Sequence, residues 1–599
     1  MRILRAAMAK RGPDGEGEYI DHHIALGMRR LAIIDLKTGD QPMEAAKGQI
    51  LAFQNGEIYN FRDLRRVLVS KGCHFVSQSD TEVLAHGYAV WGLAGLLDRL
   101  DGMYALAIFD RRKGLLHLAR DPLGEKPLFI AQRPQCFAFA SSLLPLAALP
   151  WVDQTIDPRA LDQYLALHYV PGDATILKGI RRILPGEAIT LSIESLKVIR
   201  SRYYRPKTGA MRPLEVETLS AMIEQAVCSR LVADVKVGVF LSGGVDSSLV
   251  SAIAAHHSPG IRTFSMGFAD QSYDESAFAD VVARHVGSEH TRFIFDRDSF
   301  ADLIPEVAGA LDEPLGDQAL LPLYWLARAA ATQVKVVLSG EGADELFGGY
   351  FYYEPLTRTP YRSHAYSWLR GLLSAFRGQR DCRARFLDAT RNATPSGFPL
   401  AGELYAREVV TKRRFDDPSS WEVDVLQWLE RASCPLQRAR AADVATWLPD
   451  DLLVKLDRMT MAHSIEGRAP YLQRALVDAA LALPDEQIIS NGKNKHLLRQ
   501  VAERWLPPEI FQRPKQGFNL PMRQWLGNWI EKQGGARTYF SGVSVLGLDG
   551  DATSELVGAD LAAGTIRDRF VMALILLIEW HRGFANKTAA LARALSHGS

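Results

Sequence analysis

The stretch LSGGVDSS, residues 241–248, stands between an expected β-strand, VKVGVFL (235–241), and an expected helix, SSLVSAIAAHH (247–257). Its two adjacent glycines allow the backbone to turn tightly and to approach a ligand closely. Backbone N–H groups and the N-terminus of the following helix favour a bound anion. Asp246 fits such a site if it holds Mg²⁺ against phosphate oxygens. A glycine-rich turn that only caps a helix is the alternative, but the whole octapeptide in this context predicts a phosphate-binding loop.

This loop differs from the G-x-x-x-x-G-K-[ST] nucleotide loop, because no lysine stands where the β- and γ-phosphates would need one. The difference favours cleavage between the α- and β-phosphates, with the loop holding pyrophosphate. A second loop, LSGEGADELFGGY (338–350), also follows an expected strand. Ligands bind outside the carboxyl ends of parallel strands, so the two loops are expected to flank one crevice. Glu341, Asp344 and Glu345 then suit a metal or catalytic role better than an acidic surface turn.

The regions around these loops predict two structural units. After residue 214, expected strands at 262–268, 291–295 and 334–339 alternate with helices, which favours a parallel sheet with helices on both faces. Residues 355–599 read as mostly helical, and the arginine-rich stretch 362–391 as a solvated helical insertion.

The first part of the chain has a different pattern. Residues 1–145 contain short β-like runs between turn residues, which predicts a mainly antiparallel sheet with a few helices, such as one at 62–72. Residues 150–213 have no strong pattern and are expected to connect the two units.

The composition is that of an ordinary globular protein, with 47% hydrophobic and 23% charged residues. A net charge of +1 gives no electrostatic reason to expect a nucleic acid or a membrane as partner. The five cysteines lack metal-ligand spacing, and with no visible signal peptide they fit reduced thiols in the cytoplasm. The longest apolar run, 570–578, is too short to span a bilayer and is expected to form a buried helix.

Two sets of motifs together carry a resemblance to a known family. The first set is SGGVDSS, SGEGADELFGGY, VKLDRMTMAHSIEGRAPYL (454–472), GKNKHLLR (492–499) and RPKQGFNLP (513–521). The second set is RGPDGEG, MRRLAIIDL, NGEIYNF, SDTE, GMYALAIFD and ARDPLGEKPL, all before residue 130. With both sets in this order, the chain resembles the glutamine-dependent asparagine synthetases from about residue 9 to about residue 585.

The resemblance implies a fold and a division of the chain. It implies an α+β N-terminal-nucleophile sandwich, the class II glutamine amidotransferase fold, over residues 1–190. A linker is expected at 191–213. An α/β PP-loop ATP pyrophosphatase domain with a helical C-terminal part is expected over 214–599. The same analogy implies a homodimer.

The resemblance also implies an activity and its substrates. The synthetase domain would use ATP and Mg²⁺, with no redox cofactor, to adenylate the side-chain carboxylate of aspartate. Ammonia from glutamine would then displace AMP and give asparagine.

The resemblance implies a role for particular residues at each site. Glutamine would be bound by Arg30 through its α-carboxylate, by Asp80 through its α-amino group, and by an oxyanion hole at Asn55 and Gly56 with Glu57 nearby. The ATP site would be formed by Leu241, Ser242, Gly243, Gly244, Asp246, Ser247, Met266, Ser339 and Gly340. Asp246 and Asp344 would hold the metal, and Glu341 and Lys495 would be catalytic. Taken singly, Asn55-Gly56 also fits a hairpin turn, Asp80 a helix cap, and Lys493 rivals Lys495.

The N-terminus raises a further expectation. The family begins Met-Cys-Gly, and its exposed cysteine attacks the amide of glutamine. Here MRILRAAMAKRGPDG (1–15) matches the family only from within its first helix. The sequence as given is therefore expected to use free ammonia and to release no glutamate from glutamine. A start site placed too far downstream and a true truncation both explain this beginning.

Other functions stay open at this point. The family's EARVPFLD reads EGRAPYLQ at 466–473, which leaves room for a different carboxylate acceptor in polysaccharide or peptide biosynthesis. A degenerate synthetase that only binds nucleotide is a second alternative. Other PP-loop enzymes are a third, but the N-terminal motifs have no place in them.

Overall fold

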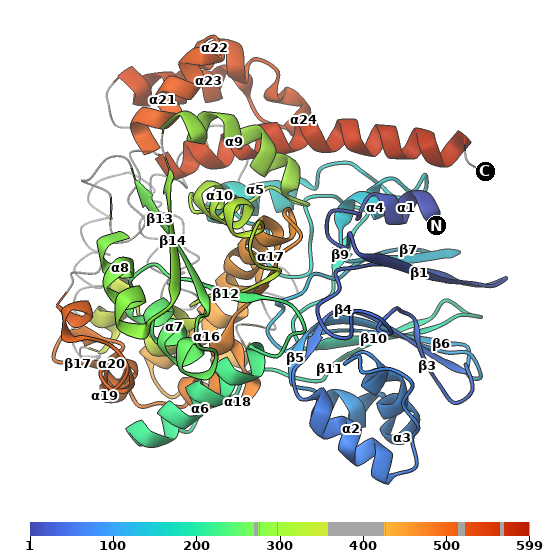
Figure 1. Cartoon of the computed structure of the whole chain (residues 1–599). Coiled ribbons are helices and arrows are strands. Elements are labelled where there is room, and N and C mark those ends of the chain that lie inside the picture. Colours follow the sequence, from blue (N-terminus) through green and yellow to red (C-terminus); the bar gives the residue numbers. More distant parts are fainter. Residues whose placement is uncertain are drawn as a thin grey trace.

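The computed structural model describes residues 1–268, 274, 276–295, 297–357, 425, 427–512, 522–562 and 568–597. Within these ranges the chain forms two units that lie side by side (Figure 1). The stretches 362–391 and 513–521, both named above, lie outside the described residues.

The N-terminal unit consists of two stacked β layers (Figure 1). One layer is an antiparallel sheet in the order β11-β10-β6-β5-β4-β3. The other contains the hairpin β1–β2 and the sheet β8-β7-β9. The strands are β1 (Gly15–Ile20), β2 (Ala25–Arg30), β3 (Met43–Ala45), β4 (Ile50–Ile58), β5 (Gly102–Asp110), β6 (Leu115–Arg120), β7 (Phe129–Arg133), β8 (Cys136–Ala140), β9 (Arg181–Arg182), β10 (Glu187–Ser192) and β11 (Val198–Arg202). The helices are α1 (Arg2–Ala6), α2 (Phe61–Ser70), α3 (Glu82–Arg99), α4 (Leu143–Ala147) and α5 (Pro158–Leu167).

Residues of β5 alternate between two cores. Leu106 and Ile108 pack with apolar residues of α2 and α3, which cover one face of the larger sheet. Ala107 and Phe109 pack with residues of the opposite layer, such as Ile130. This period of two places every second side chain on the same face. The predicted α+β sandwich is therefore found, and α2 is the helix expected near residues 62–72.

Strand β10 crosses the boundary expected at residue 190, and β11 lies inside the linker expected at 191–213. The broader expectation of a connector at 150–213 is wrong for most of that range. It contains α5 and the strands β9, β10 and β11, and the last two extend the larger sheet. Strand β11 is a mostly exposed edge strand, so its sequence VIRSR has no apolar pattern that would mark it. Because the sheet continues to Arg202, we propose 203–215 as the connector.

The second unit is built on a parallel sheet in the order β14-β13-β12-β15-β16. Its strands are β12 (Val237–Phe240), β13 (Arg262–Phe268), β14 (Glu289–Phe295), β15 (Val336–Leu338) and β16 (Glu466–Arg468). Its helices include α6 (Val216–Arg230), α7 (Val245–His257), α8 (Ser276–Val286), α9 (Arg297–Ala310) and α10 (Leu320–Ala330). Helices α6, α7 and α8 pack on one face, and α10 on the other. The predicted parallel sheet is confirmed, but β16 lies in a region expected to be helical.

Helices dominate the remainder of the described chain. They are α11 (Ala343–Phe347), α16 (Pro435–Ala445), α17 (Leu453–Met461), α18 (Arg474–Leu481), α19 (Asp485–Ile488), α20 (His496–Ala502), α21 (Met522–Lys532), α22 (Gly535–Phe540), α23 (Gly550–Ala562) and α24 (Asp568–His597). Two more short strands are β17 (Ile489–Ser490) and β18 (Lys493–Asn494). A π-helical turn, Leu448–Leu452, precedes α17.

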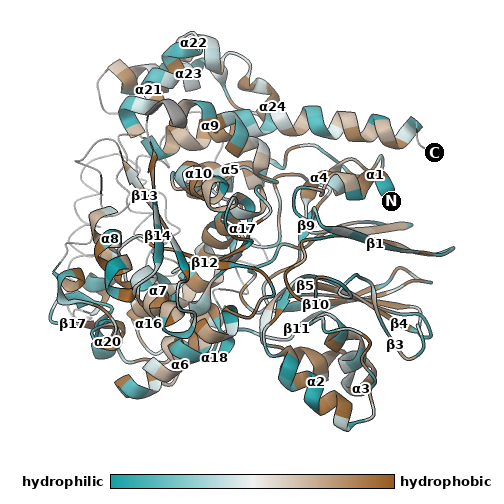
Figure 2. Ribbon diagram, in the orientation of Figure 1, coloured by the Kyte–Doolittle hydropathy of each residue, from teal (hydrophilic) through white to brown (hydrophobic). Residues whose placement is uncertain are grey.

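Helix α24 joins the two units. It packs on α9 and reaches α4, α5 and α1 of the N-terminal unit (Figure 1). Its apolar first half, which includes Phe570–Ile578, is buried as expected, and its exposed end is more polar (Figure 2). Among the helices of the described ranges, none combines the length and the apolar character that crossing a membrane requires.

Candidate active sites

The loops after β12 and β15 meet at one edge of the parallel sheet. The Ser242 N–H donates to Ser247 Oγ (3.1 Å), and the hydroxyls of these two serines lie 2.9 Å apart. A Cβ on Gly340 would lie 3.1 Å from the backbone nitrogen of Ser247, so the second loop approaches the first as closely as a glycine allows. Gly243 has φ +74°, and a Cβ there would lie 2.7 Å from the nitrogen of Ala279. The structure thus brings the two predicted loops together.

The other residues predicted for the ATP site surround this junction. Leu241 is buried directly after β12, and Gly244 caps the start of α7. Met266 lies on β13, two residues past the Phe264 that pairs with Phe240, toward the carboxyl end of the sheet. Ser339 follows β15, and its N–H donates to the backbone oxygen of Arg468 in β16 (2.9 Å).

Lys495 connects the two loops through its side chain. Its Nζ lies 2.5 Å from Asp246 Oδ2 and 2.6 Å from Asp344 Oδ1. Burial alone would lower the pKa of Lys495, but the two carboxylates outweigh it and raise the pKa above its ordinary value. Lys495 therefore stays charged, whereas Lys493 is exposed in β18.

The backbone at Lys495 supports the same choice. Its φ of 59° and ψ of 37° place a non-glycine residue in the left-handed region at the start of α20. Such conformations cost energy and cluster at functional sites. A Cβ on Gly349 would lie 2.3 Å from Lys495 Cε, so a glycine at position 349 leaves room for the Lys495 side chain.

Glu341 belongs to the second loop, and charges from outside the two loops also act on its carboxyl group. Burial and the charges of Asp317, Asp344 and Asp246 raise the pKa of Glu341, while Lys455 opposes them. Glu345 accepts a hydrogen bond from the Tyr350 hydroxyl, and burial raises the pKa of Glu345 to about 7.

Lys455, Asp317 and Asp451 are not among the residues that the sequence predicts for the site. Lys455 Nζ lies 2.6 Å from Asp317 Oδ2, and Asp451 interacts with both. Lys455 stands in the quoted motif VKLDR, but its role was not visible because its acidic neighbours are far away in sequence. The described residues contain no cluster of three or more His, Cys, Asp or Glu side chains arranged as a metal site.

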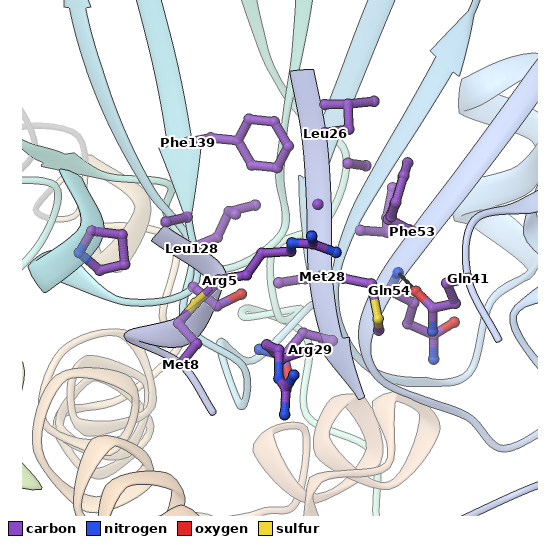
Figure 3. Close-up of a pocket in the computed structure, with 18 of the residues that line it drawn as sticks. Arg5, Met8, Leu26, Met28, Arg29, Gln41, Phe53, Gln54, Leu128 and Phe139 are labelled. Carbon is purple, nitrogen blue, oxygen red and sulfur yellow. Dashed lines mark hydrogen bonds between the residues drawn. The ribbon is translucent and has the colours of Figure 1, made fainter. Parts of the chain in front are cut away.

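A cavity of about 700 Å³ lies between the β layers of the N-terminal unit. The predicted glutamine-binding residues all line it: Arg30, Asn55, Gly56, Glu57 and Asp80. In Figure 3, Arg5 extends across the cavity, with Leu26 and Phe139 on one side and the amides of Gln41 and Gln54 at another. The cavity thus has one apolar wall and one polar wall.

The polar wall of this cavity is held by buried hydrogen bonds. Asn55 and Gly56 lie within β4, so the alternative of a hairpin turn is wrong. A Cβ on Gly56 would lie 2.0 Å from the Met103 carbonyl oxygen of β5, which only a glycine avoids. Asp80 accepts hydrogen bonds from the Ile58 N–H and the Gln54 side chain, both at 2.9 Å, and burial raises the pKa of Asp80. The N-cap of α3 is Thr81, so Asp80 is not that cap.

Arg30 is partly engaged within the chain itself. It lies 3.0 Å from the exposed carboxylate of Asp40 and donates to the backbone oxygens of Ile34 and Asp35. Its guanidinium group is thereby held at the cavity wall.

Glu57 joins this cavity to the second unit. Arg468 of β16 lies 3.4 Å from Glu57 and 2.8 Å from Glu466, and it is fully buried. Burial raises the pKa of Glu57 well above its ordinary value, and the charge of Asp80 adds to the effect. Glu466, which belongs to the second unit, also lines the cavity. The inner end of the cavity therefore lies at the interface of the two units.

Two families match the chain in sequence. The family described as glutamine amidotransferase domain matches residues 1–204, and the family described as asparagine synthase matches residues 218–582. A Mycobacterium tuberculosis protein named as an asparagine synthetase (glutamine-hydrolysing) is 37% identical over 563 residues, which cover 88% of this chain and 84% of the relative.

Two further relatives carry similar names. Asparagine synthetase (glutamine-hydrolysing) 1 of Bacillus subtilis is 34% identical over 539 residues, with 88% of this chain and 85% of the relative covered. A relative of the same name from Arabidopsis thaliana is 30% identical over 452 residues, with 70% and 71% covered. This chain therefore belongs to the asparagine synthase family, and it joins a glutamine amidotransferase domain to an asparagine synthase domain.

Proposed function

We propose that this protein is an ATP-dependent ligase that forms asparagine from aspartate. The aspartate side-chain carboxylate attacks the α-phosphorus of ATP, and the bond to pyrophosphate breaks. Ammonia then attacks the acyl carbon of the aspartyl adenylate, and AMP leaves. The observation that carries the proposal is the position of Lys495 between two strand-end loops, one of which has the form of a pyrophosphate loop.

Each loop has a proposed task. Ser242, Gly243, Gly244 and Ser247 bind the pyrophosphate part of ATP through backbone N–H groups and hydroxyls. Leu241, Met266, Ser339 and Gly340 contact the adenosine and AMP part. Lys495 stabilises the charge that develops on the phosphate oxygens. Glu341, a residue of the second loop on which the charges of Lys455 and Asp317 also act, takes part in the adenylate step.

Asp246 and Asp344 are proposed to hold Mg²⁺ together with the phosphates of ATP. Their donor atoms suit the ion, because Mg²⁺ is usually bound by one or two carboxylates plus substrate phosphates. The bound ion would neutralise charge on the phosphates. Lys495 already contacts both carboxylates, so it orients them for this role.

The N-terminal unit is proposed to bind glutamine as the amide donor. Arg30 forms a fork suited to the α-carboxylate, and Asp80 suits the α-ammonium group. Asn55 and Gly56 would donate hydrogen bonds to an oxyanion at the amide carbon. Asn55 Nδ2 is buried, lines the cavity and has no hydrogen-bond partner among the described residues, which supports this role.

Pyrophosphate release tests the synthetase activity most directly. The protein is incubated with ATP, MgCl₂, ammonium chloride and aspartate, and both pyrophosphate and asparagine are measured. We expect both products in equal amounts. Aspartate is compared with sugar and peptide carboxylates, because turnover of one of those instead of aspartate would replace this proposal with the other acceptor class. The relatives' names favour aspartate.

Two further statements belong to the same proposal. A substrate such as ATP favours the cytoplasm as the place of action. Homodimerisation is proposed from the family resemblance alone, and analytical ultracentrifugation of the purified protein tests it.

A further inference from the structure

Four ionisable side chains gather beside the nucleotide loops from four different elements. Asp317 precedes α10, Glu341 follows β15, Asp451 lies in the π-helical turn and Lys455 in α17. Lys455 Nζ is 2.6 Å from Asp317 Oδ2, and the charges of Glu341 and Asp451 also act on it. The group thus sets three carboxyl groups against the ammonium group of Lys455, and the charge of Arg569 also acts on Asp317.

Asp451 is buried, and the charges of Asp317, Lys455 and Glu341 act on its carboxyl group. Its Oδ2 accepts a hydrogen bond from Trp447 Nε1, while its Oδ1 is buried and has no hydrogen-bond partner among the residues that the structure describes. The neighbouring Asp450 points elsewhere, because it binds Arg182 (3.1 Å) and the Gly172 N–H (2.8 Å) of the N-terminal unit. A π-helical turn is frequent at functional sites. The two adjacent aspartates of this turn thus have different partners.

Lys455 and Arg569 do not offset the effect of burial on Asp451 and Glu341. Burial, and then the charge of Asp317, raise the pKa of Asp451 to about 8. Burial also raises the pKa of Glu341. Like charges that share a site disfavour ionisation of all its members. Lys455 is the cation that opposes the shift at Asp451, and a bound cation beside Asp451 would relieve the remaining repulsion.

We propose that Asp317 and Asp451 bind the α-ammonium group of the amino-acid acceptor. Lys455 positions Asp317 and offers its charge to the acceptor's α-carboxylate. The inference rests on the proposed function, because it names what recognises the acceptor at that site. It defines the acceptor class as an amino acid whose ammonium group is free and close to the reacting carboxylate.

The position of Glu341 supports this assignment. The charges that act on it come from Asp317 and Lys455 on one side and from Asp246 and Asp344 on the other. In aspartate, the ammonium nitrogen is separated from the side-chain carboxyl carbon by only two carbon atoms. A short acceptor held by the ammonium site therefore places its side-chain carboxylate near Glu341 and the phosphate loops.

The first experiment needs no variant. Pyrophosphate release is measured with aspartate, succinate and N-acetylaspartate, each with ATP, MgCl₂ and ammonium chloride. The last two keep the reacting carboxylate but lack an ammonium group. We expect kcat/KM to fall by ~10²-fold or more for both, because a site built for a hydrogen-bonding group strongly rejects its absence. Equal turnover of succinate and aspartate would overturn the inference.

The second experiment tests Asp451 directly. In Asp451→Asn the acceptor for Trp447 Nε1 is kept and the carboxylate is lost. We expect the KM for aspartate to rise ~10- to 100-fold, as for the loss of a hydrogen bond to a charged group, with the KM for ATP unchanged. The control is Asp478→Asn on α18. It removes a carboxylate that accepts a hydrogen bond from the Tyr204 hydroxyl, and it should change neither the KM for aspartate nor the KM for ATP.

The outcomes separate the inference from the proposed function. No pyrophosphate release by the unaltered protein with aspartate would refute the proposed function itself. Normal release with an unchanged KM for aspartate in Asp451→Asn would refute only the ammonium site. If Asp451→Asn does not fold, as judged by thermal unfolding, Asp317→Asn is measured for the same change, and an unchanged KM there refutes the site equally.

Discussion

Replacing Lys495 with methionine tests the centre of the proposed mechanism. The change keeps the length and burial of the side chain and removes its charge. Lys495 is only 8% exposed, and it separates two carboxylates that are 22% and 27% exposed. Its loss would leave Asp246 and Asp344 facing each other without a cation.

Both activity and stability are expected to fall. Removing one electrostatic stabiliser of a transition state typically costs ~10²–10³-fold in kcat, so we expect a loss of this size in pyrophosphate release. Breaking a buried ion pair costs ~3–5 kcal/mol. We expect about 3 kcal/mol in the free energy of unfolding without nucleotide, at the low end because the carboxylates are a quarter exposed.

The pH dependence of this stability effect has a definite sign. The pKa of Lys495 is raised in the folded protein, so its contribution is fully present below the pKa of the unfolded chain. It is lost only as the pH rises through the higher folded value, above about 10.5. The deficit of Lys495→Met should therefore be constant between pH 6 and pH 9 in urea unfolding.

Lys493→Met is the matched control for this experiment. It removes the same charge two residues earlier, from an exposed position in β18. We expect it to leave kcat and stability unchanged. The reasoning fails if Lys495→Met keeps kcat within a few-fold of the unaltered protein, or if Lys493→Met loses as much.

Three further predictions concern other parts of the molecule. Gly340→Ala should weaken ATP binding, as measured by calorimetry, because the added Cβ would lie only 3.1 Å from the backbone nitrogen of Ser247. The control is Gly558→Ala, where the added Cβ meets no atom within 4 Å and ATP binding should not change. Asp457→Asn should cost ~3–5 kcal/mol in unfolding free energy at pH 7, since Arg11 and Lys126 overcome the effect of burial and lower the pKa of Asp457. The pKa of Asp457 in the folded protein lies below its value of about 4 in the unfolded chain. The stabilising contribution of Asp457 is therefore present above about pH 4 and declines as the pH falls below that value. If the difference in unfolding free energy between the unaltered protein and Asp457→Asn grew in acid, this reasoning would be contradicted. Arg30→Lys should weaken glutamine binding about 10-fold through loss of the planar fork, with unchanged ammonia-dependent synthesis, and an unaltered glutamine affinity would remove Arg30 from the site.

The sequence predicts best what is local and periodic. The strands at 262–268 and near 334–339, the helix near 62–72 and the buried run 570–578 all have a pattern of their own, and the structure confirms them. The motif LSGGVDSS likewise predicts its loop, because the glycines and the following helix are contiguous. The family comparison agrees with the domains that these motifs imply.

The sequence predicts poorly what is created by distant neighbours. Strand β16 has three residues and exists because Val336–Leu338 of β15 pairs with it across more than a hundred residues of chain. Lys455 could not be selected, since its partner Asp317 is 138 positions away. Lys495 and Lys493 differ little in sequence, but only the fold gives Lys495 its left-handed backbone and its two carboxylates.

Strand β16 also explains how the two units are held in register. The backbone of Arg468 accepts the Ser339 N–H at the start of the second loop, while its side chain contacts Glu57 at the cavity of the N-terminal unit. The same guanidinium donates to the backbone oxygens of Arg230 and Val232, next to α6. A buried arginine with these partners resists displacement, because any shift would leave charges unpaired in a water-poor interface. The loop that contributes Glu341 and the strand that contributes Asn55 and Gly56 are therefore fixed to one side chain, so a movement at either site must strain the other.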